Sequence, residues 1–359
     1  MCNYMSTRSL SISGFFMNIL VTGGAGFIGS HTCVALVEAG WRPIIVDNFS
    51  NADRSVLQGL TRILGKAPMC YEGDCNDLQL MKHILKKESI AGVIHFAAFK
   101  AVGESVAQPL KYYENNIGSL ITLLKAMEQT GATKLVFSSS CTVYGQSDVV
   151  PVTEDTPRKS AASPYGNTKA ICEDILRDVV TSGATLKTIA LRYFNPIGAH
   201  KSAEIGELPI GVPANLVPFV TQSAAGIRPP VTVFGTDYNT PDGTCIRDYI
   251  HVMDLAEAHV KALAFLDKTP APFYETINVG TGKGSSVLEV LETFQKKVDA
   301  SLQYALGDRR AGDVEATYAS VEKAQSALGW TAKRSLEEAL QDAWRWQKQL
   351  NGRINQVLS

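Results

Sequence analysis

A tyrosine and a lysine four residues apart, Tyr165 and Lys169, form the pair in this sequence that most directly suggests acid–base chemistry. Ser163 is a good helix N-cap and Pro164 suits the first helical position, so a helix is expected to begin here with Tyr165 in its first turn. Residues four apart share a helix face, and a nearby ammonium lowers a tyrosine pKa from its usual value of about 10. The pair could therefore exchange a proton with a substrate hydroxyl. Taken alone, the same spacing is also common on solvated helices.

A glycine-rich turn near the start of the chain indicates a dinucleotide site. It follows an apolar run over 18–22 and precedes a periodic segment over 27–39, and its glycines are Gly23, Gly24, Gly26 and Gly29. The pattern predicts strand, turn and helix, in which the glycines and the free N–H groups of the helix accept a pyrophosphate. The alternative is a turn that only requires positive φ.

An acidic residue stands where a dinucleotide site needs one. A second apolar run over 43–46 ends at Asp47, which lies 18 residues after Gly29. An acid at about this interval binds the adenosine ribose hydroxyls of NAD. Its charge would repel the extra phosphate of NADP, although Arg54 is close enough to leave NADP open. NAD is therefore the expected cofactor.

The alternation of strand and helix continues to about residue 197. Further strands are expected over 69–71, 93–97, 134–137 and 187–191, with helices over 78–85 and 108–129 and the helix of Tyr165 between them. We predict an α/β fold: a Rossmann-type, doubly wound parallel sheet formed by residues 17–197. Ligands lie at the carboxyl ends of such strands. The serine run 138–140 should therefore open from its strand toward Tyr165, unless it is simply a polar loop.

The sequence pattern changes at Gly198, where glycines, prolines and short segments replace the regular alternation of strand and helix. Helices are expected over 216–225, 255–266, 287–298 and 335–350, with short strands over 231–234 and 276–279. We predict a smaller mixed α/β substrate lobe over 198–359, with some of its elements returning to the main sheet.

Composition excludes several classes of function. The 359 residues are 45% hydrophobic and 19% charged, and 34 Lys+Arg against 35 Asp+Glu give a net charge of −1. No basic face is implied, so neither nucleic acid nor an anionic membrane is an expected partner. No run reaches the ~20 apolar residues of a spanning helix.

The cysteines and histidines argue against disulfide or metal chemistry. The seven cysteines are odd in number and scattered, and this is typical of reduced thiols in a cytoplasmic protein. The six histidines are spread along the chain and are expected to pack in the core or lie on the surface, so no metal site is predicted. Residues 1–16 are interpreted as a poorly ordered extension, with a short targeting peptide as the alternative.

The order and spacing of several motifs resemble those of the extended short-chain dehydrogenase family. The motifs are VTGGAGFIGSH, HFAAFKAVGES, SSSCTVYG, SPYGNTK, LRYFNPIGAH and RDYIHVMDLA. Within the family, HFAAFKAVGES and RDYIHVMDLA resemble the UDP-glucose 4-epimerases, over about residues 17–349. This implies an NAD-dependent isomerase of galactose metabolism that interconverts UDP-glucose and UDP-galactose through a 4-keto sugar. It also implies a homodimer in which the helices near 111–129 and 165–180 form a four-helix bundle.

The resemblance also implies a role for individual residues. Tyr165 would be the base, Lys169 would bind the nicotinamide ribose and lower the tyrosine pKa, and Ser140 would bind the sugar hydroxyl. The NAD site would contain Gly23, Gly26, Phe27, Ile28, Gly29, Asp47, Asn48, Asp74, Phe96, Ala97, Lys100, Asn115, Tyr165, Lys169 and Phe194. The UDP-hexose site would contain Lys100, Ser140, Tyr165, Asn195, Asn215, Leu216, Phe234, Arg247, Tyr249, Arg310, Asp313 and Thr317.

Two of these assignments carry open points. Arginine suits a pyrophosphate because a guanidinium binds phosphate oxygens in pairs, but Arg247 or Arg310 singly could be a surface ion pair, and Arg309 is adjacent. Family members carry either tyrosine or a smaller residue at the position of Thr317. A small residue leaves room for an N-acetyl group, so activity on UDP-N-acetylhexosamines is a hypothesis. A shift of one residue would instead place Tyr318 there.

Three other functions compete with epimerisation. A nucleotide-sugar 4,6-dehydratase would need an acid pair after Ser140, where this chain has Cys141 and Thr142. A net oxidoreductase would release NADH. A binding module without catalysis would not need Ser140, Tyr165 and Lys169 together.

Overall fold

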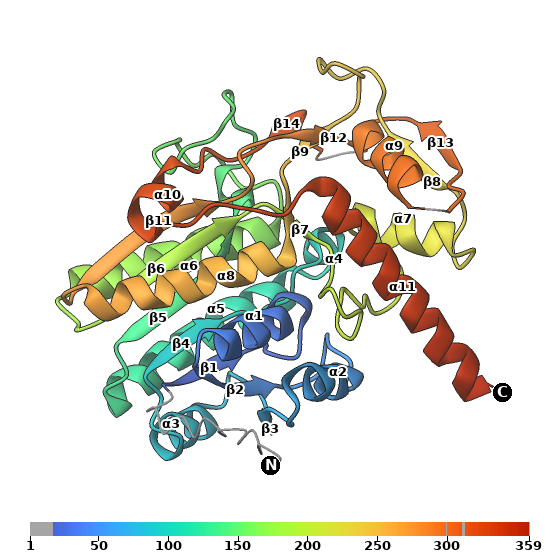
Figure 1. Cartoon of the computed structure of the whole chain (residues 1–359). Helices are drawn as coiled ribbons and strands as arrows, with labels where there is room; N and C mark the ends of the chain where they lie inside the picture. The colour runs from blue at the N-terminus through green and yellow to red at the C-terminus, as the bar shows by residue number, and fades with distance from the viewer. Residues whose placement is uncertain (1–16, 299, 311–312, 359) are drawn as a thin grey trace, which may run out of the picture.

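The computed structural model describes residues 17–298, 300–310 and 313–358. Its centre is a sheet of seven parallel strands in the order β11-β6-β5-β4-β1-β2-β3, covered by helices on both faces (Figure 1). The strands are β1 (Asn18–Thr22), β2 (Arg42–Asp47), β3 (Met69–Glu72), β4 (Gly92–His95), β5 (Lys134–Ser140), β6 (Lys187–Tyr193) and β11 (Phe273–Val279). The predicted α/β doubly wound fold is confirmed.

Two groups of helices bury the two faces of the sheet. One face carries α1 (Phe27–Glu38), α2 (Ser55–Leu64), α8 (Val252–Lys268) and α10 (Glu322–Leu328). The other carries α3 (Leu78–Lys87), α5 (Pro109–Thr130) and α6 (Pro164–Thr181). The short α4 (Val102–Ala107) lies beside α5 and α6, and the 3-10 turn η1 (Cys141–Tyr144) follows β5. The strands are apolar on both sides because both faces are covered.

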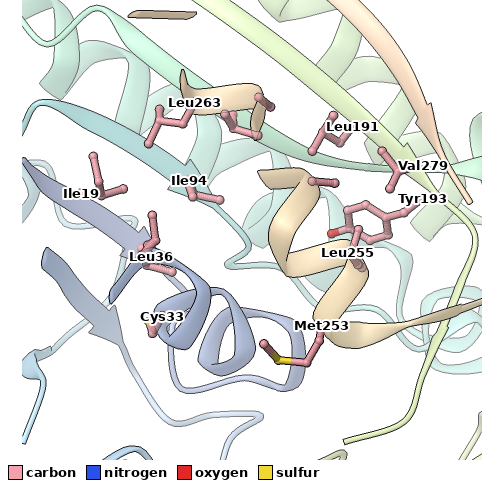
Figure 2. Packing of buried hydrophobic residues seen from close by; sticks show 14 of the residues in the cluster. Ile19, Cys33, Leu36, Ile94, Leu191, Tyr193, Met253, Leu255, Leu263 and Val279 are labelled. Carbon is pink, nitrogen blue, oxygen red and sulfur yellow. The ribbon is translucent and has the colours of Figure 1, made fainter. Parts of the chain in front are cut away.

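The core between the sheet and the helices α1 and α8 shows how the second half of the chain contributes to the first. Figure 2 shows Leu36 of α1 and Leu255 of α8 packed with Ile94 and Leu191 of the sheet. All four side chains are buried. Burial of each such side chain stabilises the fold by about 1.5–3 kcal/mol. Helix α8 is therefore part of the dinucleotide-type core although it follows residue 198.

The remaining elements form a smaller layer beyond the carboxyl ends of the sheet (Figure 1). They are β7 (Asn195–Ile197), α7 (Leu216–Ala224), β8 (Val231–Phe234), β9 (Ile246–Arg247), β10 (Tyr249–His251), β12 (Ser285–Ser286), α9 (Val287–Lys297), β13 (Tyr304–Gly307), β14 (Ala316–Thr317) and α11 (Leu336–Leu358). A separate apolar cluster joins α7, α9 and α11. Strand β11 pairs with β6 in the main sheet.

Most predicted elements are present with ends that shift by a few residues. Strand β1 coincides with its prediction, whereas β5 continues through Ser140 instead of ending before the serine run. The helices α2, α4 and α10 and most short strands of the second half were not predicted. The predicted extension over 1–16 lies outside the described residues.

Five of the six histidines are buried, and three of them, His31, His95 and His259, have pKa values that burial lowers far below 6.5. These three are called the neutral histidines below. Burial lowers the pKa of His31 to about 3, of His95 to about 3 and of His259 to about 4. They lie in the core, as predicted. Among the described residues, no helix is long and apolar enough to cross a membrane.

Candidate active site

Helix α6 begins where the sequence predicts and presents its tyrosine at the carboxyl ends of the strands. Ser163 is the N-cap, its Oγ accepts a hydrogen bond from the Gly166 N–H at 3.2 Å, and Pro164 is the first helical residue. Tyr165 therefore lies in the first turn and Lys169 one turn later. The Lys169 side chain is buried under the end of β5.

The lysine amine is directed at the strand instead of the tyrosine hydroxyl. Lys169 Nζ donates a hydrogen bond to the Ser138 carbonyl oxygen at 2.7 Å and lies 5.0 Å from the centre of the Phe137 ring. Burial lowers the pKa of Lys169 to about 8, and the neighbouring Cys172 and Glu173 act in the opposite direction.

The predicted lowering of the tyrosine pKa is wrong for the protein alone. Burial raises the pKa of Tyr165 to about 12, although a hydrogen bond with Ser140 opposes the change. The physical reason is that removing a phenolate from water costs more free energy than one hydrogen bond to it supplies. The Lys169 ammonium, which could favour the phenolate, is instead bonded to the Ser138 carbonyl oxygen.

The serine run is the end of a strand in which each serine has its own partner, so the polar-loop interpretation is wrong. Ser138 Oγ pairs with the Tyr193 hydroxyl. Ser139 Oγ donates to Glu173 Oε1 at 2.6 Å, and Ser140 Oγ accepts from the Thr142 N–H at 3.2 Å. These contacts bring Ser140 beside Tyr165.

The glycine turn after β1 is built for close backbone approach. Gly23 has a φ of +68°, and a Cβ on it would lie 2.8 Å from the Ala97 nitrogen, so only glycine fits. Helix α1 begins after Gly26 with no side-chain cap, which leaves the N–H groups of its first turn, including those of Phe27 and Ile28, available to an anion. The turn can therefore accept a pyrophosphate.

Asp47 lies at the end of β2 beside this turn. Its carboxylate accepts hydrogen bonds from the Ala25 N–H at 3.0 Å and the Phe49 N–H at 2.9 Å, and burial raises its pKa. The sequence did not predict this second task, in which the acid also braces the glycine turn.

The other residues expected around the cofactor follow the ends of neighbouring strands. Asn48 Nδ2 donates to Asp74 Oδ2 at 3.0 Å, which joins the ends of β2 and β3. Phe96 and Ala97 follow β4, and Phe194 follows β6. Asn115 on α5 instead donates to Asn116 Oδ1 at 3.0 Å.

A glutamate missed by the sequence analysis connects two predicted ligand residues. Glu207 Oε1 accepts from Lys100 Nζ at 3.2 Å and from Asn215 Nδ2 at 2.7 Å. Its backbone oxygen accepts from Trp346 Nε1 at 3.0 Å. Asn215 is the N-cap residue of α7 and Leu216 the first residue of that helix. No motif or spacing in the sequence singled out Glu207.

Three charged residues converge near Phe234. Asp313 Oδ1 lies 2.8 Å from Arg310 Nη2 and 3.8 Å from Arg247 Nη2, and the Arg310 guanidinium lies 5.6 Å from the Phe234 ring centre. Arg309 turns away and donates to Asp237 Oδ1 at 2.7 Å. The geometry favours Arg310 over Arg309 as the second arginine of the site.

Short strands bring the remaining predicted residues to the same region. Asn195 and Tyr249 are register partners in the β7–β10 pair, and Tyr249 is buried. Thr317 is the register partner of Arg247 in the β14–β9 pair. The next residue, Tyr318, packs its ring against Gly284.

Metal and disulfide chemistry find no support among the residues that the structure describes. No group of three or more His, Cys, Asp and Glu side chains there could hold a metal ion. The six described cysteines are all free thiols.

Comparison with known proteins agrees with this geometry. A family model described as GDP-mannose 4,6 dehydratase matches residues 20–343. The UDP-glucose 4-epimerase of Bacillus subtilis is 51% identical over 332 residues, which cover 92% of this chain and 97% of that protein. The structure of a UDP-glucose 4-epimerase from Stenotrophomonas maltophila, with bound NAD and formylated UDP-arabinopyranose, is 46% identical with a TM-score of 0.91, covering 94% of this chain and 99% of that one.

A further solved structure is the UDP-Glc/GlcNAc 4-epimerase of Campylobacter jejuni. It is 36% identical with a TM-score of 0.79 and covers 93% of this chain and 99% of its own. The chain belongs to the family that the matching model describes and, within it, to the UDP-glucose 4-epimerases.

Proposed function

We propose that this protein interconverts UDP-glucose and UDP-galactose with a tightly held NAD, as a step of galactose metabolism. The observation that carries the proposal is that Tyr165 lies against Ser140, with Lys169 one helical turn beyond it, at the carboxyl end of a sheet that also presents the glycine turn and Asp47. A protein that only binds nucleotides would not need the first three residues together.

The residues around the glycine turn fit NAD. A Cβ on Gly23 or Gly29 would meet backbone atoms at 2.8 and 2.3 Å, so the turn can come close to a pyrophosphate only as glycine. Asp47 and Asn48 would hold the adenosine ribose, and Lys169 would hold the nicotinamide ribose. NAD, when bound, accepts the hydride from the sugar C4 and returns it.

Two side chains of the site would carry out the proton transfer at the sugar C4 hydroxyl. Tyr165 would take the proton of the C4 hydroxyl and Ser140 would bind the same oxygen. The burial that raises the pKa of Tyr165 is opposed once a positive nicotinamide lies nearby, because an opposite charge favours the phenolate. Lys169, whose amine now donates to the Ser138 carbonyl oxygen, would bring a positive charge to the same end of β5.

The nucleotide would bind in the smaller layer, which is formed mainly by residues 198–359, although α8, α10 and β11 of that range belong to the main sheet and its core. Arg247 and Arg310 would bind the pyrophosphate in pairs of hydrogen bonds, and Asp313 holds both guanidinium groups in place. The remaining UDP-hexose contacts would come from Lys100, Asn195, Asn215, Leu216, Phe234 and Tyr249.

We extend the proposal to N-acetylated UDP-hexoses. Thr317 is paired with Arg247, whereas the larger Tyr318 packs against Gly284 and is held by its backbone, since its carbonyl accepts from the Val152 N–H at 2.9 Å. The small residue is therefore the one beside the nucleotide contacts. The relative from Campylobacter jejuni, with both sugars in its name, supports this extension.

We also propose that the protein is a cytoplasmic homodimer. Helices α5 and α6 lie side by side and are joined by a hydrogen bond from Asn116 Nδ2 to Thr168 Oγ1 at 3.1 Å. Helix α5 exposes Leu110 and Ile121, at 79% and 37%, and two such helix pairs would form a four-helix bundle. The free thiols of the described cysteines support a reducing compartment.

The proposed function is tested by incubating the purified protein with UDP-galactose and, separately, with UDP-N-acetylgalactosamine, without added NAD, and following the 4-epimer by NMR. Conversion of both sugars is expected. Conversion of UDP-galactose alone would overturn the extension to N-acetylated sugars. No conversion of either sugar, with NAD then supplied, would refute the epimerase proposal, and a Tyr165→Phe variant with wild-type turnover would refute the role of Tyr165.

A further inference from the structure

A buried glutamate lies on the catalytic helix but has no part in the proposed reaction. Glu173 is one helical turn beyond Lys169 and two turns beyond Tyr165, and it is 1% exposed. A glutamate is almost never fully buried unless its charge is paired. Its surroundings must therefore explain its presence.

Two residues of adjacent strands donate hydrogen bonds to its carboxylate, and a second arginine, Arg158, lies 3.6 Å from Oε2 through its Nη1. Arg192 donates to both oxygens, from Nε to Oε1 at 2.8 Å and from Nη2 to Oε2 at 2.6 Å. Ser139 Oγ also donates to Oε1, at 2.6 Å. Ser139 and Arg192 are register partners in β5 and β6, so their side chains share the face of the sheet that α6 covers. Glu173 thus clamps the ends of two strands to the catalytic helix.

The same row continues to the third strand and beyond it. Asn278 of β11 is the register partner of Arg192. Arg192 Nη1 donates to the Tyr144 hydroxyl at 3.0 Å, and that hydroxyl donates to Asn278 Oδ1 at 2.6 Å. Asn278 Nδ2 donates to the Val152 oxygen at 3.0 Å. A continuous buried network therefore runs from α6 to the segment that pairs with Tyr318.

Stability alone is a poor reason for such an arrangement. Replacing a buried ion pair by apolar residues of similar volume is often neutral or stabilising, because desolvation of the charges offsets their attraction. A fully satisfied buried network instead fixes geometry, since each member has one set of partners. Here the fixed residue, Ser139, directly precedes Ser140.

We propose that Glu173, through Ser139 and Arg192, is a positioning residue that holds the end of β5 and Lys169 in the arrangement that catalysis needs. This inference rests on the proposed function. It predicts that the charge and hydrogen bonds of Glu173 affect turnover, whereas substrate affinity, which depends on the smaller layer, stays nearly constant.

The charge of Glu173 also bears on the titration of Lys169. The titratable groups that act on this amine are His95 of β4 and Cys172 and Glu173 of α6. Two arginines, Arg192 of β6 and Arg158, face Glu173, and Tyr193 of β6 is bonded to Ser138, whose carbonyl oxygen accepts from the amine. Glu173 and Cys172 are the groups that raise its pKa against the effect of burial. Loss of the Glu173 charge would therefore lower the pH at which Lys169 loses its proton.

The test compares Glu173→Gln with the matched control Asp178→Asn. The control makes the same charge change at an exposed residue of the same helix. Asp174 is not suitable, because its partner Arg158 also lies 3.6 Å from Glu173 Oε2. For Glu173→Gln we expect kcat with UDP-galactose to fall about tenfold to a hundredfold with KM within about twofold. The alkaline limb of its pH–kcat profile should move down by about one pH unit. The control should match the wild type.

Three results would overturn the proposal. The first is a wild-type kcat in Glu173→Gln. The second is a kcat that falls only in proportion to the unfolded fraction of the variant, while the alkaline limb of the pH–kcat profile stays where it is in the wild type. The third is an equal fall of kcat in the control variant. If Glu173→Gln does not fold, Ser139→Ala removes one hydrogen bond and leaves the ion pair, and an unchanged kcat in that variant would overturn the proposal. An inactive wild-type protein would refute the proposed function instead.

Discussion

Replacement of Gly29 by alanine should release the cofactor from an otherwise folded protein. Gly29 lies in the first turn of α1, and a Cβ there would lie 2.3 Å from the Gly23 oxygen and 2.8 Å from the Gly24 Cα. Both neighbours are backbone atoms that cannot rotate away, so the glycine turn must move by roughly 1 Å to restore van der Waals contact.

The expected size of the effect follows from that displacement. Overpacking of this kind costs about 1–3 kcal/mol of folding free energy. Loss of one hydrogen bond to a charged phosphate costs about 1.5–3 kcal/mol of binding free energy, which corresponds to about tenfold to a hundredfold in NAD affinity. The free energy of folding and the free energy of NAD binding should therefore fall by similar amounts, and the tightly held cofactor should be lost during purification.

The matched control is Gly40→Ala, because Gly40 lies just after the end of the same helix. Gly40 has a φ of +81°, and a Cβ on it would meet no atom within 4 Å. Its replacement costs only the strain of a left-handed alanine, about 1–2 kcal/mol, and leaves the turn in place.

The assay measures NAD released by denaturing each purified variant, its affinity for added NAD by calorimetry, and its thermal unfolding. We expect Gly29→Ala to carry little NAD and Gly40→Ala to carry the wild-type amount. Full NAD content with wild-type affinity in Gly29→Ala would refute the assignment of the glycine turn to the pyrophosphate. Equal NAD loss in both variants would show that general destabilisation, and not the turn, is responsible.

Three further predictions concern pH and specificity. The neutral histidines have folded-state pKa values below the unfolded value of 6.5, so below pH 6.5 the unfolded chain binds more protons than the folded one. The free energy of unfolding should therefore drop by about 1.4 kcal/mol per pH unit for each histidine as the pH falls. Urea unfolding between pH 7 and pH 5 measures this dependence, and an unaltered dependence of the free energy on pH in His259→Gln would contradict it. Thr317→Tyr should reduce kcat/KM for UDP-N-acetylgalactosamine at least about tenfold while UDP-galactose stays within about threefold, and equal changes for the two sugars would count against the gate. Arg310→Ala should raise KM for UDP-galactose about tenfold to a hundredfold, whereas Arg309→Ala, whose side chain is bound to Asp237, should leave it within about twofold; a larger effect of the second variant would reverse the assignment.

The strongly periodic part of the chain was predictable because local pattern and tertiary structure agree there. Strand β1, helix α1 and the start of α6 appear where composition and capping place them. Helix α2 was missed, and its Gly59 is one reason. A Cβ there would lie 2.3 Å from the Glu204 oxygen, so packing against a distant loop requires a residue that weakens the helical pattern.

The site was predictable in its residue types but not in its contacts. The Tyr165–Lys169 spacing indicates proton chemistry, yet it does not reveal that the amine binds the Ser138 carbonyl. A polar loop stayed open as the alternative for the serine run, because its hydroxyl partners, Tyr193 and Glu173, are far away in sequence. Short strands such as β9 and β14 exist only because the folded chain brings them together, so no local propensity marks them.

The return of β11 to the main sheet bears on the mechanics and the unfolding of the molecule. The chain leaves the Rossmann layer after β6, comes back for α8 and β11, and leaves again, so several covalent connections cross between the two layers. A single hinge cannot open such an arrangement, because each crossing would have to bend at the same time. Nor can residues 17–197 fold alone without exposing the edge of β6 and the face of α1 that α8 covers. The two layers are therefore one cooperative unit, and they should melt in one transition.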